Sequence, residues 1–95
     1  MRDTFTLRED PGHGWLIVTK AELAQLGLTE ADISPYSYQR GEAVALEENC
    51  DLSTFIEAYR ARFDFVPLIE VEHNGSAIRG WAGYGSKVWT WESVA

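Results

Sequence analysis

Five apolar side chains recur at helical spacing between residues 51 and 63, and this stripe constrains the fold more than any other feature. Leu52, Phe55, Ile56, Tyr59 and Phe63 follow the i, i+3, i+4, i+7, i+11 pattern that places side chains on one face of a helix. Asp51 is the expected N-cap, and Pro67 prevents the helix from running further. Charged residues occupy the other sides. We therefore expect a surface helix with one face in the core.

The segments before this helix have the lengths and patterns of paired strands. Residues 4–9 alternate between polar and apolar, residues 15–18 form a short apolar run, and turn formers lie between them. This pattern predicts a first hairpin. Residues 36–39 and 43–46 flank Arg40-Gly41-Glu42 and predict a second one.

Short helices are expected between these hairpins. Thr19 and Glu22 have capping-box spacing, and Gly27 stands where a left-handed C-terminal cap is least costly. Residues 29–32 repeat the capping signal, but Pro35 leaves room for about one turn.

The segment after the long helix predicts a third hairpin. Residues 68–73 alternate, Asn74-Gly75 is the strongest short hairpin signal, and residues 76–79 follow it. The expected fold class is therefore α+β: a small single domain over residues 1–95, with a mostly antiparallel sheet of hairpins, one long helix and one or two short helices.

The net charge of the chain limits the kinds of partner that it can bind. Fifteen acidic and eight basic residues give a net charge of -7, which argues against direct binding to nucleic acid or to an anionic membrane and favours a basic protein surface. The candidate partner-binding residues are Glu30, Asp32, Glu42, Glu47, Glu48 and Asp51. On one surface these carboxylates would have spacings comparable to DNA phosphates. The alternative is that they favour helix N-termini and keep a small protein soluble.

The sequence contains no convincing catalytic or metal-binding pattern. Cys50 is the only cysteine, so it can form no intramolecular disulfide, and its acidic neighbours would raise a thiol pKa. We expect it to be structural and at least half-buried. His13 and His73 lie sixty positions apart and lack metal-ligand spacing, and His13 is expected to be a turn residue. We expect no catalytic residue, no metal, no cofactor and a cytoplasmic location.

Aromatic residues near the C-terminus suggest an alternative binding surface. Glycines interleave with Trp81 and Tyr84, and Trp89 and Trp91 share one face of an alternating run. The segment is not placed between a strand and a helix as a phosphate-binding loop requires. The alternative function is thus a small interaction or accessory module that uses Trp81, Tyr84, Trp89 and Trp91 as an apolar patch.

Three segments carry a resemblance to a family of small proteins encoded by bacteria, phages and mobile elements. They are residues 10–16 (DPGHGWL), 33–39 (ISPYSYQ) and 46–51 (LEENCD), within a resemblance that spans about residues 7–65. Asn49 departs from the acidic residue common at that place. No catalytic residue is carried over from the family.

The resemblance implies a setting of conflict between hosts and mobile elements. Very small acidic proteins from that setting resemble anti-CRISPR and anti-restriction inhibitors, several of which mimic DNA. The first hypothesis is therefore a non-enzymatic, anti-CRISPR-like inhibitor in the host cytoplasm, which covers the basic DNA-binding surface of a CRISPR effector subunit with its acidic residues.

Overall fold

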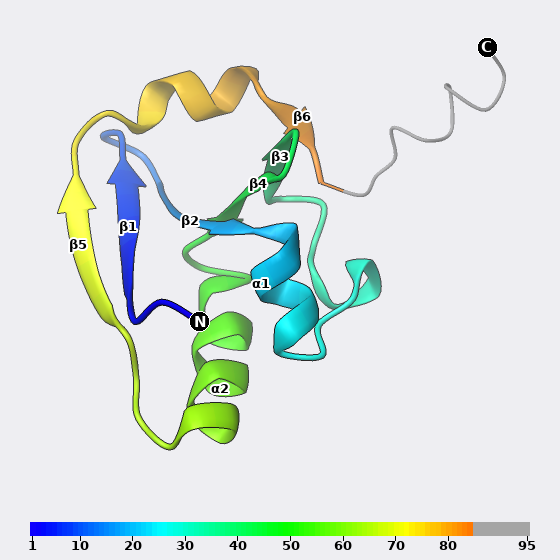
Figure 1. Cartoon of the computed structure of the whole chain (residues 1–95). Helices are drawn as coiled ribbons and strands as arrows, with labels where there is room; N and C mark the ends of the chain where they lie inside the picture. Colours follow the sequence, from blue (N-terminus) through cyan, green and yellow to red (C-terminus); the bar gives the residue numbers. More distant parts are fainter. Residues whose placement is uncertain (85–95) are drawn as a thin grey trace, which may run out of the picture.

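Two hairpins side by side form the centre of a six-stranded, mostly antiparallel sheet with the order β5-β1-β2-β4-β3-β6 (Figure 1). The computed structural model describes residues 1–84. Its elements in chain order are β1 (Thr4–Glu9), β2 (Gly14–Thr19), α1 (Lys20–Gln25), η1 (Glu30–Asp32), β3 (Tyr38–Arg40), β4 (Ala43–Glu47), α2 (Leu52–Phe63), β5 (Leu68–Glu72), η2 (Gly75–Gly80) and β6 (Ala82–Gly83), where η denotes a 3-10 helix. The predicted α+β class is confirmed.

The first two hairpins are confirmed. β1 and β2 are antiparallel, and a side-chain oxygen of Asp10 shapes their turn by accepting hydrogen bonds from the N–H groups of Gly12 and His13, both at 2.9 Å. β3 and β4 are also antiparallel, and β4 pairs with β2 along its whole length. The two hairpins therefore join into one sheet.

The helices begin where the sequence indicates. At α1, Thr19 Oγ1 accepts from the Glu22 N–H at 3.0 Å, and Glu22 Oε1 accepts from the Thr19 N–H at 2.9 Å, which completes the capping box. Gly27 has a φ of 76°, as a left-handed cap requires. α2 is the long helix, but it ends at Phe63, and Asp64 caps it with a φ of 66° before Pro67 is reached.

The main core lies between the sheet and the two α-helices. Its buried members come from both helices, from alternate positions of the strands and from two positions just after η1 and β6: Phe5, Leu7, Leu16, Val18, Leu23, Ile33, Val44, Leu46, Phe55, Tyr59 and Tyr84. Phe5 meets the Phe55 ring edge-on, with the ring centroids 5.1 Å apart. The amphipathic stripe of α2 therefore packs as its spacing predicts.

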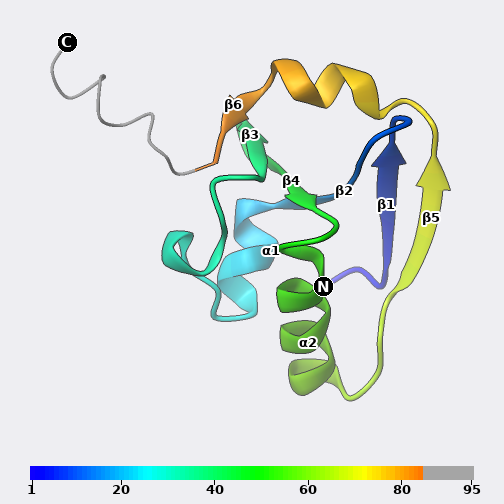
Figure 2. The same ribbon diagram turned by 180° about the vertical axis from the view of Figure 1, so that it is seen from behind.

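The third hairpin was predicted wrongly. β5 does form, but it pairs in parallel with β1, and residues 75–80 are the 3-10 helix η2. β5 and β6 lie at opposite edges of the sheet, so the chain must cross from one edge to the other through η2, as both views show (Figures 1 and 2). The Asn-Gly signal is overridden because Ile78 becomes fully buried against the sheet.

This crossover builds a second, smaller core on the sheet face opposite the α-helices. Trp15, Ala45 and Ile78 are its buried members, and Ile17, Tyr38 and Trp81 pack around them. Both faces of the central strands are thus covered, which explains why β2 reads as a continuous apolar run. Within residues 1–84, no helix is long and apolar enough to cross a membrane.

Candidate functional site

Two adjoining hollows lie around the β1–β2 turn and share His13. The first, the acidic groove, has a volume of about 520 Å³ and is lined by Glu9, Asp10, Pro11, Gly12, His13, Glu48 and His73. The second, the aromatic hollow, has a volume of about 230 Å³ and is lined by His13, Trp15, Pro35, Tyr36, Tyr38, Glu47, Cys50 and Arg79. Both hollows bring charged and aromatic side chains together, so they form the candidate binding site.

Arg79 connects η2 to the β1–β2 turn. Its guanidinium pairs with Asp10, with 3.2 Å from Nη2 to Oδ1, and lies over the Trp15 ring at 5.3 Å from the centroid. The hydrogen bond from Arg79 holds the pKa of Asp10 well below its usual range, and the Asp10 carboxylate raises the pKa of Arg79 in turn. Both groups are therefore charged at neutral pH.

The same arginine fixes the tautomer of His13. Nη2 of Arg79 lies 3.0 Å from His13 Nδ1, and a guanidinium has only donors, so Nδ1 must accept. In the neutral ring the proton then lies on Nε2, which is 3.9 Å from Glu47 Oε2. His13 is exposed, as a turn residue should be, yet its ring stacks on Trp15 and forms part of both hollows.

Asp51 is a buried structural residue rather than a surface carboxylate. It is 3% exposed, and it makes no capping bond to α2. Its carboxylate accepts hydrogen bonds from the Ser34 N–H at 3.0 Å, from Ser34 Oγ at 2.7 Å and from Ser37 Oγ. Ser37 Oγ accepts from the Glu47 N–H at 2.9 Å. This network holds residues 34–37 against the end of β4, and it leaves Asp51 unable to contact a partner directly.

Glu47 is a buried residue of the aromatic hollow. Only 6% of it is exposed, and its Oε1 accepts from the Asn49 N–H at 2.6 Å. Its second oxygen faces His13. Nearby, Trp15 is 1% exposed and its Nε1–H has no acceptor within the part of the chain that the structure describes. The indole N–H of Trp15, a residue that lines the hollow, therefore has bonding capacity to spare.

Cys50 is exposed, not half-buried as expected. Loss of hydration around its sulfur and the Glu47 carboxylate next to it raise the pKa of the thiol, so it stays protonated at neutral pH. Cys50 and His13 line the same hollow, but Glu47 is the common neighbour of both. The geometry does not produce an activated thiolate.

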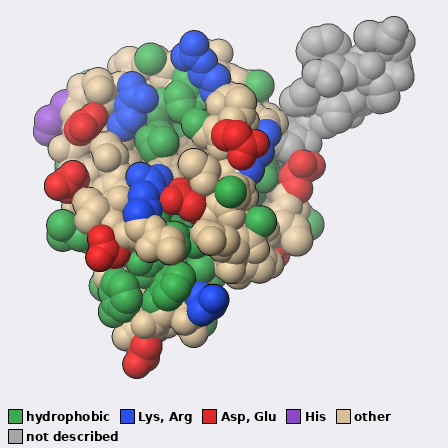
Figure 3. Space-filling view, viewed as in Figure 1, with side chains coloured by type: hydrophobic (Ala, Val, Ile, Leu, Met, Phe, Trp, Pro, Cys, Tyr) green, Lys and Arg blue, Asp and Glu red, His purple; other side chains and the backbone are tan. Residues whose placement is uncertain are grey.

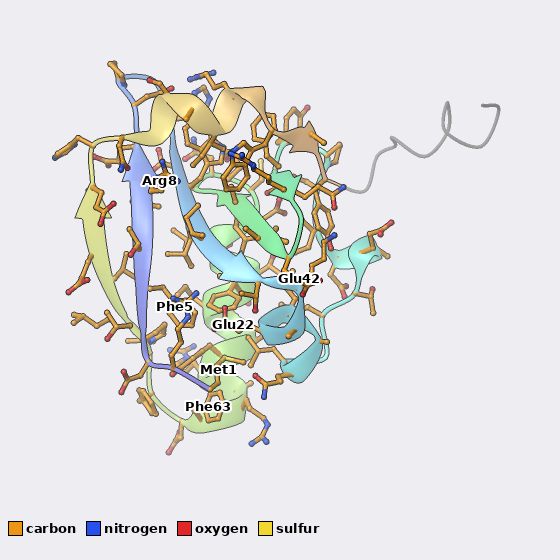
Figure 4. The ribbon with its side chains drawn as sticks, turned by 45° about the horizontal axis from the view of Figure 1, so that its top comes forward. Met1, Phe5, Arg8, Glu22, Glu42 and Phe63 are labelled. Carbon is orange, nitrogen blue, oxygen red and sulfur yellow. The ribbon has the colours of Figure 1, made fainter. Side chains whose placement is uncertain are left out.

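The other predicted acidic residues lie apart. Glu30 and Asp32 are exposed on η1, where the Asp32 carboxylate accepts from the Thr29 N–H at 2.8 Å. Glu42 precedes β4 and Glu48 follows it, so about 20 Å of strand separates them. Figure 4 places Glu42 near α1, well away from Arg8 at the other end of the sheet. Of the six residues, only Glu47 and Glu48 belong to the two hollows.

The predicted aromatic patch is not assembled by its two described members. Trp81 is half-buried and packs in the smaller core, whereas Tyr84 is 7% exposed and belongs to the main core on the other face. Burial, with a smaller contribution from Glu30, raises the pKa of Tyr84. Trp89 and Trp91 lie outside the described residues. The exposed aromatic side chains of the described part are instead Tyr36 and Phe65.

Several site residues were missed from the sequence. Arg79 meets Asp10 across 69 positions, and this contact exists only because η2 crosses the sheet. Tyr36 and Tyr38 looked like ordinary strand residues. Apart from Arg79, every residue of the aromatic hollow comes from the three segments 10–16, 33–39 and 46–51. These segments lie apart in the sequence, and only the fold brings them together.

Comparison with known protein families, with curated proteins and with solved structures finds no significant match for this chain. Within residues 1–84, no three His, Cys, Asp or Glu side chains are grouped so that they could hold a metal ion. The function must therefore be argued from the geometry of the two hollows.

Proposed function

We propose that this protein is a non-enzymatic binding protein that receives a Lys or Arg side chain of a basic partner in the aromatic hollow. The observation that carries the proposal is the Glu47 carboxylate, more than nine-tenths buried in a hollow that is also lined by Trp15, Tyr36 and Tyr38. A carboxylate beside aromatic rings is the chemistry that recognises an organic cation.

The energetics favour a cation that comes from outside. Glu47 is largely buried, and the cationic candidate that faces it, His13, lies 3.9 Å away, beyond hydrogen-bond distance. An incoming ammonium or guanidinium can approach the carboxylate more closely and gains about 1 kcal/mol more from an aromatic face that it covers. The neighbouring groove, with Glu9 and Glu48, attracts the same positive charge during approach.

The protein acts in this proposal as an anti-CRISPR-like inhibitor in the host cytoplasm. The net charge of -7 favours association with a DNA-binding surface, and the setting implied by the family resemblance makes a CRISPR effector complex the first partner to test. Glu30, Asp32 and Glu42 contribute long-range attraction, because they lie away from the hollow.

The test is target-DNA binding by purified CRISPR effector complexes with and without the protein, at two salt concentrations. The expected result is loss of DNA binding that higher salt relieves. Glu47→Gln should weaken inhibition about tenfold or more, because it removes the charge but keeps an oxygen for the Asn49 N–H. The matched control is Glu42→Gln, which removes one exposed charge elsewhere and should change inhibition less than about threefold.

A second readout is independent of any effector. The indole N–H signal of Trp15 should shift in NMR spectra when N-acetyl-arginine amide is added to the wild-type protein, and much less in Glu47→Gln. Equal shifts in both proteins would remove Glu47 from the proposed recognition. If no effector complex loses DNA binding, the CRISPR role is wrong even where the arginine probe binds.

A further inference from the structure

We propose that the free edge of β5 is a docking site for an extended, basic segment of a partner protein, which adds a seventh strand to the sheet. This inference rests on the proposed function only in expecting a basic partner. It concerns a different surface, on the outer side of β5 rather than in the aromatic hollow.

Among residues 1–84, one side of the β5 backbone has no neighbouring strand. Within this described part of the chain, β5 is an edge strand and pairs only with β1, in parallel. The Leu68 N–H bonds to the Asp3 carbonyl at 2.8 Å, so residues 68, 70 and 72 direct their backbone groups toward β1. Ile69 and Val71 direct theirs away from the sheet. An incoming strand would find these N–H and C=O groups available.

The side chains around this edge are unusually apolar for an exposed strand. Val71 is 51% exposed and Leu68 62%, and just before the strand Phe65 is 49% and Val66 54% exposed. The space-filling view shows hydrophobic side chains gathered between the lower part of β5 and the end of α2, with acidic side chains beside them (Figure 3). An added strand would cover part of this surface and extend the main core, which Ile69 already contacts.

Charge specifies what kind of segment fits. Glu70 and Glu72 lie on the sheet face opposite Ile69 and Val71, and both are exposed. Arg8 is the neighbour of Glu72 on β1, but its guanidinium bonds to Asn74, at 2.9 Å from Nε to Oδ1. These two carboxylates thus favour Lys or Arg on the corresponding face of the added strand.

A second copy of this chain fits less well. Antiparallel pairing of two β5 strands centred on Glu70 places that residue opposite itself, and pairing centred on Val71 places Glu70 opposite Glu72. Like charges directly opposite are destabilising. Pairing centred on Ile69 sets Leu68 against Glu70. The acidic positions therefore oppose self-association and select a strand that alternates apolar and basic residues.

The experiment measures binding of a fluorescein-labelled, end-capped Lys-Val-Lys-Val-Lys peptide to the full chain by fluorescence anisotropy. Val71→Pro removes an outward N–H and leaves the β1 pairing intact, because proline is tolerated on a strand edge. Its matched control, Val71→Thr, keeps that N–H. We expect binding to fall at least about tenfold in Val71→Pro and less than about threefold in Val71→Thr.

A second variant tests the role of charge and combines Glu70→Lys with Glu72→Lys. It should bind the basic peptide more weakly than wild type and should bind a Glu-Val-Glu-Val-Glu peptide instead. Equal binding by the proline and threonine variants, or equal binding of the two peptides to the wild-type chain, would overturn the inference. A wild-type dimer in sedimentation that Val71→Pro dissociates would assign the edge to a second copy instead.

The proposed cation site in the aromatic hollow and the proposed docking edge of β5 can be contradicted independently of each other. Glu47→Gln should leave the anisotropy titration unchanged, and Val71→Pro should leave the response of the Trp15 indole to N-acetyl-arginine amide unchanged. Loss of both responses in either variant would indicate misfolding, which circular dichroism of the same samples detects.

Discussion

Asp51 shows how one side chain can organise two loops. Its carboxylate accepts from the backbone and hydroxyl of Ser34 and from the hydroxyl of Ser37, and Ser37 in turn receives the Glu47 N–H. Asp51→Ala leaves these buried donors without their acceptor, so we expect a loss of about 2–3 kcal/mol in the free energy of unfolding. Urea denaturation followed by tryptophan fluorescence measures it.

The matched control for this prediction is Asp32→Ala. Asp32 also accepts hydrogen bonds from its own loop, but it is exposed, so water replaces the lost partner and the expected cost is about 1 kcal/mol or less. If both variants lose the same free energy of unfolding, burial does not explain the contribution of the Asp51 hydrogen bonds to stability.

At the scale of the element, η2 depends on a close approach of its first residue to β1. A Cβ added at Gly75 would lie 2.7 Å from the carbonyl carbon of Glu9 and 2.9 Å from the carbonyl oxygen of Arg8. Both are backbone atoms and cannot move aside. Gly75→Ala should therefore displace the crossover and cost about 1–3 kcal/mol. The effect is measured as a fall in melting temperature with a changed tryptophan emission of the chain, to which Trp81 contributes.

The same helix provides the control. At Gly80 an added Cβ meets nothing within 4 Å, so Gly80→Ala should leave both readouts close to wild type. A similar fall in both variants would mean that backbone freedom, rather than contact with β1, is what η2 requires.

The elements that the sequence predicted correctly are those whose signals are local. The capping box at Thr19, the turn at Asp10 and the stripe of α2 each depend on residues a few positions apart. The hairpin predicted at Asn74-Gly75 was wrong because contacts distant in sequence outweigh the local turn signal. β5 pairs with β1, and Ile78 packs with Trp15 in the smaller core. Local preference is a weak guide wherever tertiary burial competes with it.

The candidate site was harder to predict for the same reason. The sequence predicts Glu47 and Asp51 as surface charges, yet the fold buries both and gives each a specific set of neighbours. Arg79 gave no signal at all, because its partner Asp10 lies at the other end of the chain. Charge counts predict the kind of partner, whereas the position of each charge depends on packing.

At the scale of the whole molecule, two ion pairs join distant parts of the fold and make its stability depend on pH. Arg79 of η2 holds Asp10 of the first turn, and Arg2 holds Glu22 of α1 at 2.6 Å. The Arg79 hydrogen bond lowers the pKa of Asp10. Burial opposes ionisation of Glu22, but hydrogen bonds from Arg2 and Thr19 outweigh it and lower that pKa also.

Both carboxyl groups have a lower pKa in the folded chain than in the unfolded chain, so each makes its full contribution to the free energy of unfolding above its unfolded pKa of about 4. That contribution is lost as the pH falls from the unfolded pKa through the lower folded pKa, because the folded state must then take up protons. The melting temperature should therefore decline steadily from about pH 5 to pH 2.

Asp10→Asn tests the origin of this decline. The amide oxygen can still accept from Gly12 and His13, but it no longer carries the charge that Arg79 holds. The variant should be less stable than wild type at pH 7 and should lose less stability on acidification, so the difference in melting temperature between the two proteins should shrink as the pH falls from about 5 towards 2. The matched control is Glu57→Gln, which removes an exposed carboxylate of α2 that belongs to neither ion pair. Parallel curves for Asp10→Asn would mean that the link between η2 and the first turn is not electrostatic.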